Sequence, residues 1–193
     1  MGHGFTTEKF SRRFRRHVVV EGSPAVIQRF RETHPDCRAQ IVEGRFETFQ
    51  TTERFDAIVM GFVLEHVDDP ALIVRRFKRF LKPGGFIGMA VPNARSLHRL
   101  IGHEAGLLDD VYKLSAEDRQ LGHKRYFDLE SFKRLAESEG LVVRRARGIM
   151  MKPVTTRQLS ALNLSADVRE ALFKVADDLP AISNSLYLEA QMP

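Results

Sequence analysis

The chain has 193 residues, a formal net charge of +5 and a hydrophobic fraction of 43%. This length suits one domain with a single packed core, and no apolar run is long enough for a signal peptide or a membrane span. One cysteine, Cys37, cannot form an internal disulfide and fits a reducing cytoplasm, while the seven histidines lack the close paired spacings of a structural zinc site. We therefore expect a single cytoplasmic domain over residues 1–193 with no metal site.

Short apolar strands and helices alternate along the chain, in the order that hydrophobic period and capping residues indicate. A helix is predicted over 6–14, a buried strand over 17–21, a helix capped by Ser23 over 23–33, and strands over 39–43 and 55–60. Asp69 or Pro70 begins a helix that runs to Leu81, where Lys82-Pro83-Gly84-Gly85 stops it, and a strand follows over 86–91.

Residues 93–127 carry no strand signal and are expected to hold one or two short helices in a variable substrate or lid segment. Asp128 then caps a helix that ends at Gly140, and strands over 141–147 and 186–190 flank helical patterning over 155–178. This alternation predicts an α/β fold with a mostly parallel, Rossmann-like sheet and helices on both faces. Ligands of such sheets bind beyond the carboxyl ends of the strands.

Basic residues form three groups, which invites a nucleic-acid interpretation. They are Arg12, Arg13, Arg15 and Arg16, then Arg75, Arg76, Lys78 and Arg79, then Arg144, Arg145 and Arg147. The first two groups interleave with phenylalanines that we expect to point inward, namely Phe10, Phe14, Phe77 and Phe80. Scattered charge of this kind favours the solvated faces of amphipathic helices, so no nucleic-acid partner is expected.

Two features near the start of the chain suit a nucleoside-containing ligand. Gly2 and Gly4 precede a helix, so backbone can approach a ligand beside a positive helix end. Glu21 ends the next strand, where a carboxylate can accept hydrogen bonds from both hydroxyls of a ribose.

Three further motifs resemble the class I S-adenosylmethionine-dependent methyltransferases of small molecules. Phe55-Asp56 opens the middle strand, Leu64-Glu65-His66 follows it, and Lys82-Pro83-Gly84-Gly85 precedes the next strand. The resemblance covers residues 2 to about 148 and implies S-adenosylmethionine as the cofactor and an antiparallel C-terminal strand pair. It also implies cofactor contacts at Gly2, Gly4, Glu21, Gly22, Arg45, Phe46, Glu47 and Gly61.

One departure from the family concerns its first motif, a strand, an acidic residue and Gly-x-Gly-x-Gly. The chain opens at Met1-Gly2-His3-Gly4, so the central first strand and the start of the glycine motif are expected to be missing. In the family's strand order 3-2-1-4-5-7-6 this loss leaves the sheet without its middle strand, and we expect weakened stability and cofactor binding. A start site assigned too late and a truncated paralogue both remain open.

The resemblance implies methyl transfer to a small-molecule or glycan-precursor acceptor, and we expect an oxygen acceptor. His66, just after the middle strand, and His123, in the expected lid segment, are the candidate general bases, although both could instead be structural. Glu65 is expected to accept backbone N–H groups in its turn. The alternatives are a truncated, non-catalytic paralogue or partner subunit, an RNA methyltransferase and a dehydrogenase.

Overall fold

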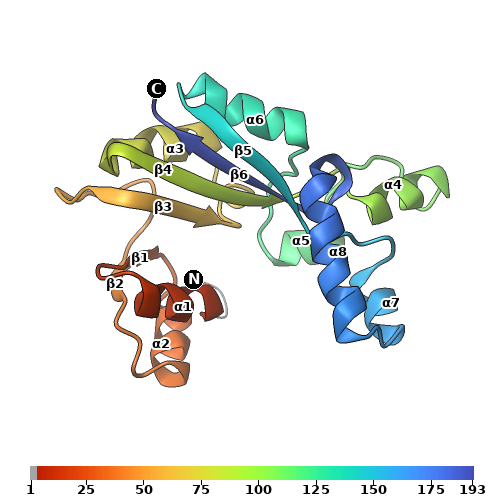
Figure 1. Cartoon of the computed structure of the whole chain (residues 1–193), viewed down its shortest axis with the longest axis horizontal. Helices are drawn as coiled ribbons and strands as arrows, with labels where there is room; N and C mark the ends of the chain where they lie inside the picture. Colours follow the sequence, from red (N-terminus) through yellow and green to blue (C-terminus); the bar gives the residue numbers. More distant parts are fainter. Residues whose placement is uncertain (1–3) are drawn as a thin grey trace. The chain divides into compact units, whose positions relative to one another are not determined.

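A computed structural model describes residues 4–193, so Met1, Gly2 and His3 lie outside the described residues. The chain divides into two compact units, one up to Thr52 and the other from Glu53 onward (Figure 1). No helix in the described part of the chain is long and apolar enough to cross a bilayer.

The first unit is a β-α-β motif preceded by a helix. Its elements are α1 (Phe5–Arg13), β1 (Val18–Glu21), α2 (Pro24–Thr33) and β2 (Gln40–Glu43). The strands are parallel, with Glu21 opposite Glu43, and α2 packs on both. Ser23 caps α2 as predicted, because its side chain accepts the N–H of Val26.

The start of the first unit depends on a glycine in the left-handed region. Gly4 caps α1 with φ +84°, and a Cβ there would stand 2.5 Å from Cδ2 of the buried Phe30. Only glycine combines that backbone conformation with this close approach to α2. Gly4 thus fixes the way in which α1 begins.

The second unit contains a four-stranded sheet in the order β3-β4-β6-β5. Its elements are β3 (Phe55–Gly61), α3 (Pro70–Phe77), the 3-10 helix η1 (Lys78–Phe80), β4 (Leu81–Pro92), α4 (Leu97–Glu104), α5 (Ala116–Gln120), α6 (Leu129–Ser138), β5 (Val142–Ile149), α7 (Thr156–Ala161), α8 (Ala166–Asp178), the 3-10 helix η2 (Pro180–Ile182) and β6 (Ser185–Gln191). β3 and β4 are parallel, whereas β6 is antiparallel to both β4 and β5. The antiparallel closing pair is therefore confirmed.

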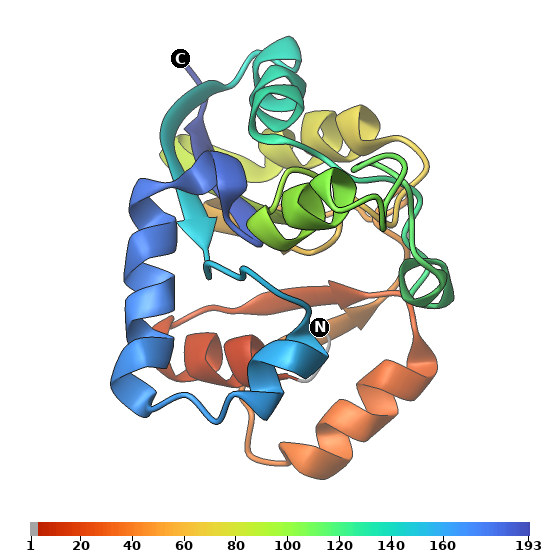
Figure 2. The ribbon, with the colours of Figure 1, turned by 90° about the vertical axis from the view of Figure 1, so that its right-hand side faces the viewer.

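The core of the second unit centres on the two inner strands. Ile87 and Met89 of β4 and Leu186 and Leu188 of β6 are all fully buried. α3 and α6 lie side by side (Figure 2), α6 contacts β5 and β6, and α8 packs on β5. Burial of these strands between helices explains their near-continuous apolar sequences.

Within each unit the strands follow the order that the resemblance predicts for that part of the family's sheet. β1 pairs with β2 and β3 pairs with β4, and no strand among residues 4–193 pairs with both β1 and β3. The predicted α/β fold, with its parallel strands and antiparallel end, is confirmed.

Three local predictions were wrong. The helix α3 ends at Phe77 rather than at Leu81, because Leu81 already pairs with Phe55 and so belongs to β4. Strand β1 is half-buried rather than buried. Phe14 does not point inward: it follows the last residue of α1, where the backbone is already extended, and its side chain is 47% exposed.

Candidate active site

Glu21 stands at the carboxyl end of β1, as predicted. Its Oε1 accepts the backbone N–H of Ser23 at 3.0 Å, which holds the carboxylate beside the start of α2. The backbone N–H of Gly44 donates to the Glu21 carbonyl at 3.0 Å, and a Cβ on Gly22 would lie 3.6 Å from the Gly44 carbonyl oxygen. Glu21 and Gly22 therefore lie directly beside the turn that follows β2.

That turn carries the three residues that the resemblance placed beside the adenine. The N–H groups of Thr48 and Phe49 both donate to the carbonyl of Arg45, which closes a helical turn. Arg45 is exposed, whereas Phe46 and Glu47 are half-buried. Their contact with a cofactor stays a prediction, as does that of Gly4 at the start of α1, and Gly2 lies outside the described residues.

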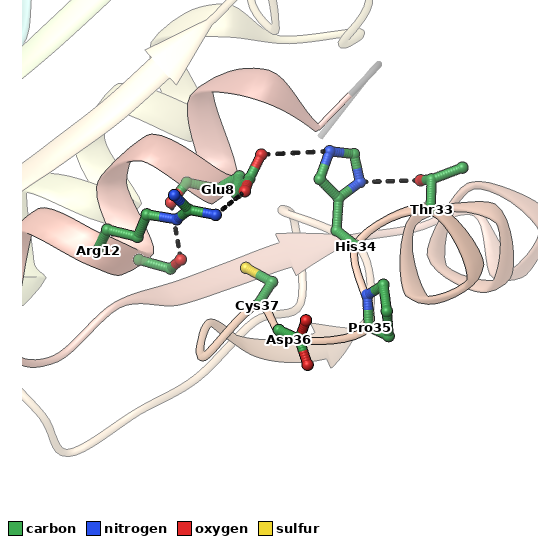
Figure 3. A pocket seen from close by; sticks show the side chains of 8 residues that line it. Glu8, Arg12, Thr33, His34, Pro35, Asp36 and Cys37 are labelled. Atoms are coloured by element: carbon green, nitrogen blue, oxygen red, sulfur yellow. Dashed lines mark hydrogen bonds and ion pairs between the residues drawn. The ribbon is translucent and has the colours of Figure 1, made fainter.

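The first unit also contains a hollow of about 220 Å³ at the opposite, amino-terminal edge of β2 (Figure 3). Glu8 lies at its centre, with Oε1 2.5 Å from a guanidinium nitrogen of Arg12 and Oε2 3.6 Å from Nε2 of His34. Thr33 Oγ1 lies 2.8 Å from the other ring nitrogen of His34. This closed set of partners, away from the carboxyl ends of β1 and β2, indicates a structural cluster.

In the second unit, β3 ends at Gly61, which is exposed and has no heavy atom near its missing Cβ position. Phe62 follows with φ +57°, an uncommon conformation for a bulky residue, while its N–H still donates to the Ala90 carbonyl of β4. Its side chain is 46% exposed. The chain therefore turns sharply at the carboxyl end of β3 and presents an aromatic ring to solvent.

His66 and His123, the two candidate bases, lie next to each other. Their ring centroids are 4.7 Å apart and the rings meet edge to face. His66 is 37% exposed at its side chain and His123 11%. Burial, followed by the neighbouring His66, lowers the pKa of His123, which favours a neutral imidazole.

Hydrogen bonds between the turn after β3 and the segment after α5 hold this pair together. The Lys124 N–H donates to the Glu65 carbonyl at 2.8 Å, and the Arg125 guanidinium donates to the Val67 carbonyl at 2.6 Å. The Lys124 ammonium also pairs with Asp68. Both backbones are thereby fixed on either side of the two imidazoles.

Glu65 does not serve the turn as predicted. Its side chain is fully buried, and neither carboxylate oxygen has a hydrogen-bond partner in the part of the chain that the structure describes. The N–H of His66, the nearest candidate donor, already bonds the Val63 carbonyl. Burial raises the pKa of Glu65 to about 7, against a smaller opposing effect of its own backbone N–H.

Glu65, His66 and His123 form a group that sequence spacing did not reveal. Each offers one ligand atom, and these atoms lie within 4.8 Å of one another. A carboxylate and two imidazoles can share protons or bind a transition-metal ion. The only sequence signal was that Leu-Glu-His and Gly-His-Lys each lie in a segment expected near the site, since nothing local pairs them.

Two further polar side chains of residues 93–127 have structural partners. Nδ1 of His98 lies 3.1 Å from Ser96 Oγ, and burial lowers the pKa of His98 to about 4, so it is neutral. The Tyr126 hydroxyl donates to Asp118, and burial raises the pKa of Tyr126 to about 12. These two side chains therefore belong to the scaffold of the segment.

Comparisons with known proteins show the family of the chain. A family model described as a methyltransferase domain matches residues 2–146. The ubiquinone biosynthesis O-methyltransferase of Aeromonas salmonicida (strain A449) is 31% identical over 111 residues, which are 56% of this chain and 44% of that protein. Its namesake from Methylobacterium sp. (strain 4-46) is 27% identical over 165 residues, 83% of this chain and 64% of that one. The chain thus spans about half the length of such relatives.

Solved structures share the fold at low identity. The N-methyltransferase NodS from Bradyrhizobium japonicum WM9, in complex with S-adenosyl-L-homocysteine, has a TM-score of 0.60 at 18% identity, over 98% of this chain and 73% of that one. The [4+2]-cyclase SpnF has a TM-score of 0.63 at 16% identity, over 98% and 72%. One fold therefore supports different chemistries, and the site has to be argued from its residues. The family match over most of the chain shows that this protein belongs to the class I S-adenosylmethionine-dependent methyltransferase family.

Proposed function

We propose that the chain transfers a methyl group from S-adenosylmethionine to an oxygen of a small-molecule or glycan-precursor acceptor. Family membership supports the reaction class, and relatives named as O-methyltransferases support an oxygen acceptor. The observation that carries the proposal is the pairing of His66 and His123 just beyond the carboxyl end of β3.

The first unit supplies the proposed cofactor contacts. Glu21 would accept the ribose hydroxyls, because its carboxylate is held at the strand end by the Ser23 N–H. Gly4 and Gly22 would let backbone approach the ligand, and the turn of Arg45, Phe46 and Glu47 would lie beside the adenine. The cofactor contact that the resemblance implies for Gly61, the last residue of β3, stays a separate prediction.

Methyl transfer is an in-line displacement, so the protein mainly aligns the acceptor with the methyl group. A hydroxyl is a weak nucleophile until its proton leaves, whereas a neutral amine already carries a lone pair. Two imidazoles beside each other suit an oxygen acceptor, since they can promote loss of the hydroxyl proton. An amine acceptor needs a base only to become neutral, and its lone pair then attacks without further proton loss.

The test incubates the chain with S-adenosylmethionine carrying a labelled methyl group and a panel of small hydroxylated compounds with matched amines. We expect labelled methyl ethers, and a fall in kcat of about 10²–10⁴-fold for His66→Ala or His123→Ala. His103→Asn, which changes a histidine of α4 outside the pair, is the matched control. Methylated amines formed at equal rates by all variants would contradict an oxygen acceptor, and cofactor binding without turnover would favour a non-catalytic paralogue.

A further inference from the structure

Glu65 poses an electrostatic problem that the described part of the chain leaves unsolved. Its carboxylate is fully buried, and neither oxygen has a hydrogen-bond partner among residues 4–193. A buried carboxylate without a partner costs several kcal/mol, so native proteins pair it or bind an ion to it. A partner from outside the chain is therefore expected at this point.

The nearest basic side chains are committed elsewhere. The Lys124 ammonium pairs with Asp68, and the Arg125 guanidinium donates to the carbonyls of Val67 and Asp68. Neither reaches the Glu65 oxygens. The groups that do approach are imidazoles, with Nε2 of His66 4.0 Å from Oε1 of Glu65.

A second buried atom in the same place also lacks a partner, namely Nδ1 of His123. Asp118 Oδ1 lies 3.5 Å from it, outside hydrogen-bond geometry, while the Asp118 carboxylate accepts from Tyr126 and from the Ser115 N–H. In metal sites a carboxylate commonly accepts the free ring N–H of a ligating histidine. A small rotation of the His123 ring would let Asp118 do so and would leave Nε2 to bind an ion.

We infer that Glu65, His66 and His123 together bind one divalent transition-metal ion. Two imidazoles and one carboxylate are a ligand set used by catalytic zinc sites and by other first-row divalent metals, whereas Mg²⁺ and Ca²⁺ prefer oxygen ligands alone. The three ligand atoms lie within 4.8 Å of one another. Bonds of about 2.0–2.2 Å place tetrahedral ligands roughly 3.4 Å apart, so the side chains must close by up to about 1.4 Å.

The scaffold allows that closure. The two backbones are already joined by the Lys124 N–H to Glu65 carbonyl bond of 2.8 Å, so only side chains need to move. His66 is more than a third exposed at its side chain, so solvent leaves room for its ring to move. Three protein ligands would leave a position on a tetrahedral ion for an oxygen of water or acceptor.

Metal binding by these three side chains does not depend on the proposed function. A catalytic role for the ion does rest on that function, which the metal site would deepen. With an ion bound, the two histidines are ligands, and an acceptor hydroxyl on the open position would lose its proton to solvent more readily. The ion would also orient that oxygen. A bound ion explains why a buried carboxylate lies next to the paired imidazoles. A proton-transfer role for the two histidines alone would not explain the carboxylate.

The test uses the full chain, stripped with a chelator, freed of it by dialysis and titrated with Co²⁺ as a spectroscopic probe. We expect binding of one ion per chain, visible absorption bands typical of nitrogen and oxygen ligands, and displacement by Zn²⁺. Loss of a partner that only orients a ligand costs about 10–100-fold in metal affinity, so loss of a direct ligand should cost at least about 100-fold. Glu65→Gln, His66→Asn and His123→Asn should all lose the bands, whereas the control His103→Asn should keep them.

Folding is checked on each variant by circular dichroism and thermal denaturation. If the buried Glu65→Gln fails to fold, the half-exposed His66→Asn decides the matter. Absence of a one-to-one Co²⁺ complex in the unmodified chain, or full binding by His66→Asn, overturns the inference. Binding of S-adenosylmethionine is measured in parallel by calorimetry. A chain that binds the cofactor but no Co²⁺ refutes only the metal site. A chain that binds Co²⁺ but no cofactor refutes only the proposed function.

Discussion

Replacing Glu21 with alanine should weaken S-adenosylmethionine binding much more than it weakens the fold. The carboxylate stands at the carboxyl end of β1 and is oriented by the Ser23 N–H at 3.0 Å. In the native chain it would exchange water for two ribose hydroxyls. Hydrogen bonds to a charged group contribute about 1.5–3 kcal/mol, which corresponds to a loss of roughly 10–150-fold in affinity.

The cost to folding is smaller and can be measured separately. Glu21→Ala removes, among its contacts, the hydrogen bond from the N–H of Ser23, which is worth about 1 kcal/mol in the free energy of unfolding. Ser23 keeps its own bond to Val26 and still caps α2. Denaturant titration should therefore show a modest shift, while isothermal titration calorimetry shows the large loss of affinity.

Glu43 provides the matched control. It is opposite Glu21 in the register of β1 and β2 and is exposed, so Glu43→Ala removes the same charge from the neighbouring strand. We expect a change of less than about threefold in affinity, because a screened charge that makes no hydrogen bond to the ligand contributes little. Unchanged binding in Glu21→Ala, or equal losses in both variants, would refute the ribose assignment.

Three further outcomes test the surroundings of the site. Gly4→Ala should destabilise the first unit by about 1–3 kcal/mol in thermal denaturation, since its Cβ would press on Phe30 at a φ that favours glycine; an unchanged melting temperature would contradict this. The two hydrogen bonds from Arg75 lower the pKa of the Glu139 carboxylate. The pair therefore stabilises the fold above the ordinary glutamate pKa, and this contribution is lost as the pH falls through the lowered pKa. Arg75→Ala should lower the stability at pH 7 more than at pH 2, measured by urea denaturation, and an equal loss at both pH values would exclude the ion pair as the cause. RNA should bind weakly and without sequence preference despite the +5 net charge, and a sub-micromolar complex at physiological salt with a steep salt dependence would count against the small-molecule proposal.

Local signals in the sequence predicted the elements well because capping is a short-range interaction. Ser23, Asp69 and Asp128 each accept the backbone N–H three residues on, as their positions before apolar runs indicated. Gly140 has φ +73° just beyond α6. Such residues act within one helical turn, so a single sequence contains the whole interaction.

The end of α3 was mispredicted for a reason outside any local window. The apolar period continues to Leu81, but Leu81 pairs with Phe55 at the start of β3, and the register of the two strands shifts between Phe55 and Ala57. Strand pairing thus competes with the helix for the same residues. Tertiary contact overrides local periodicity here.

Glu65 was misassigned because turn carboxylates accept backbone N–H groups only where those groups are still unbonded. The N–H of His66 bonds the Val63 carbonyl, and the N–H of Lys124 bonds the carbonyl rather than the carboxylate of Glu65. What remains beside the side chain is the pair of imidazoles. Sequence reasoning identified both histidines separately but could not join them, since they come from opposite ends of a long segment.

Arg99 shows how residues 93–127 set the geometry of this pair. Its guanidinium is buried and donates to the carbonyls of Val111 at 2.9 Å and Lys113 at 2.6 Å, while it stacks 4.2 Å from the ring centroid of Tyr126. Tyr126 in turn donates to Asp118, the carboxylate nearest Nδ1 of His123. An arginine fork can make these contacts at once, whereas a lysine could make only one or two. The orientation of His123 therefore depends on a residue of α4 that no sequence motif singled out.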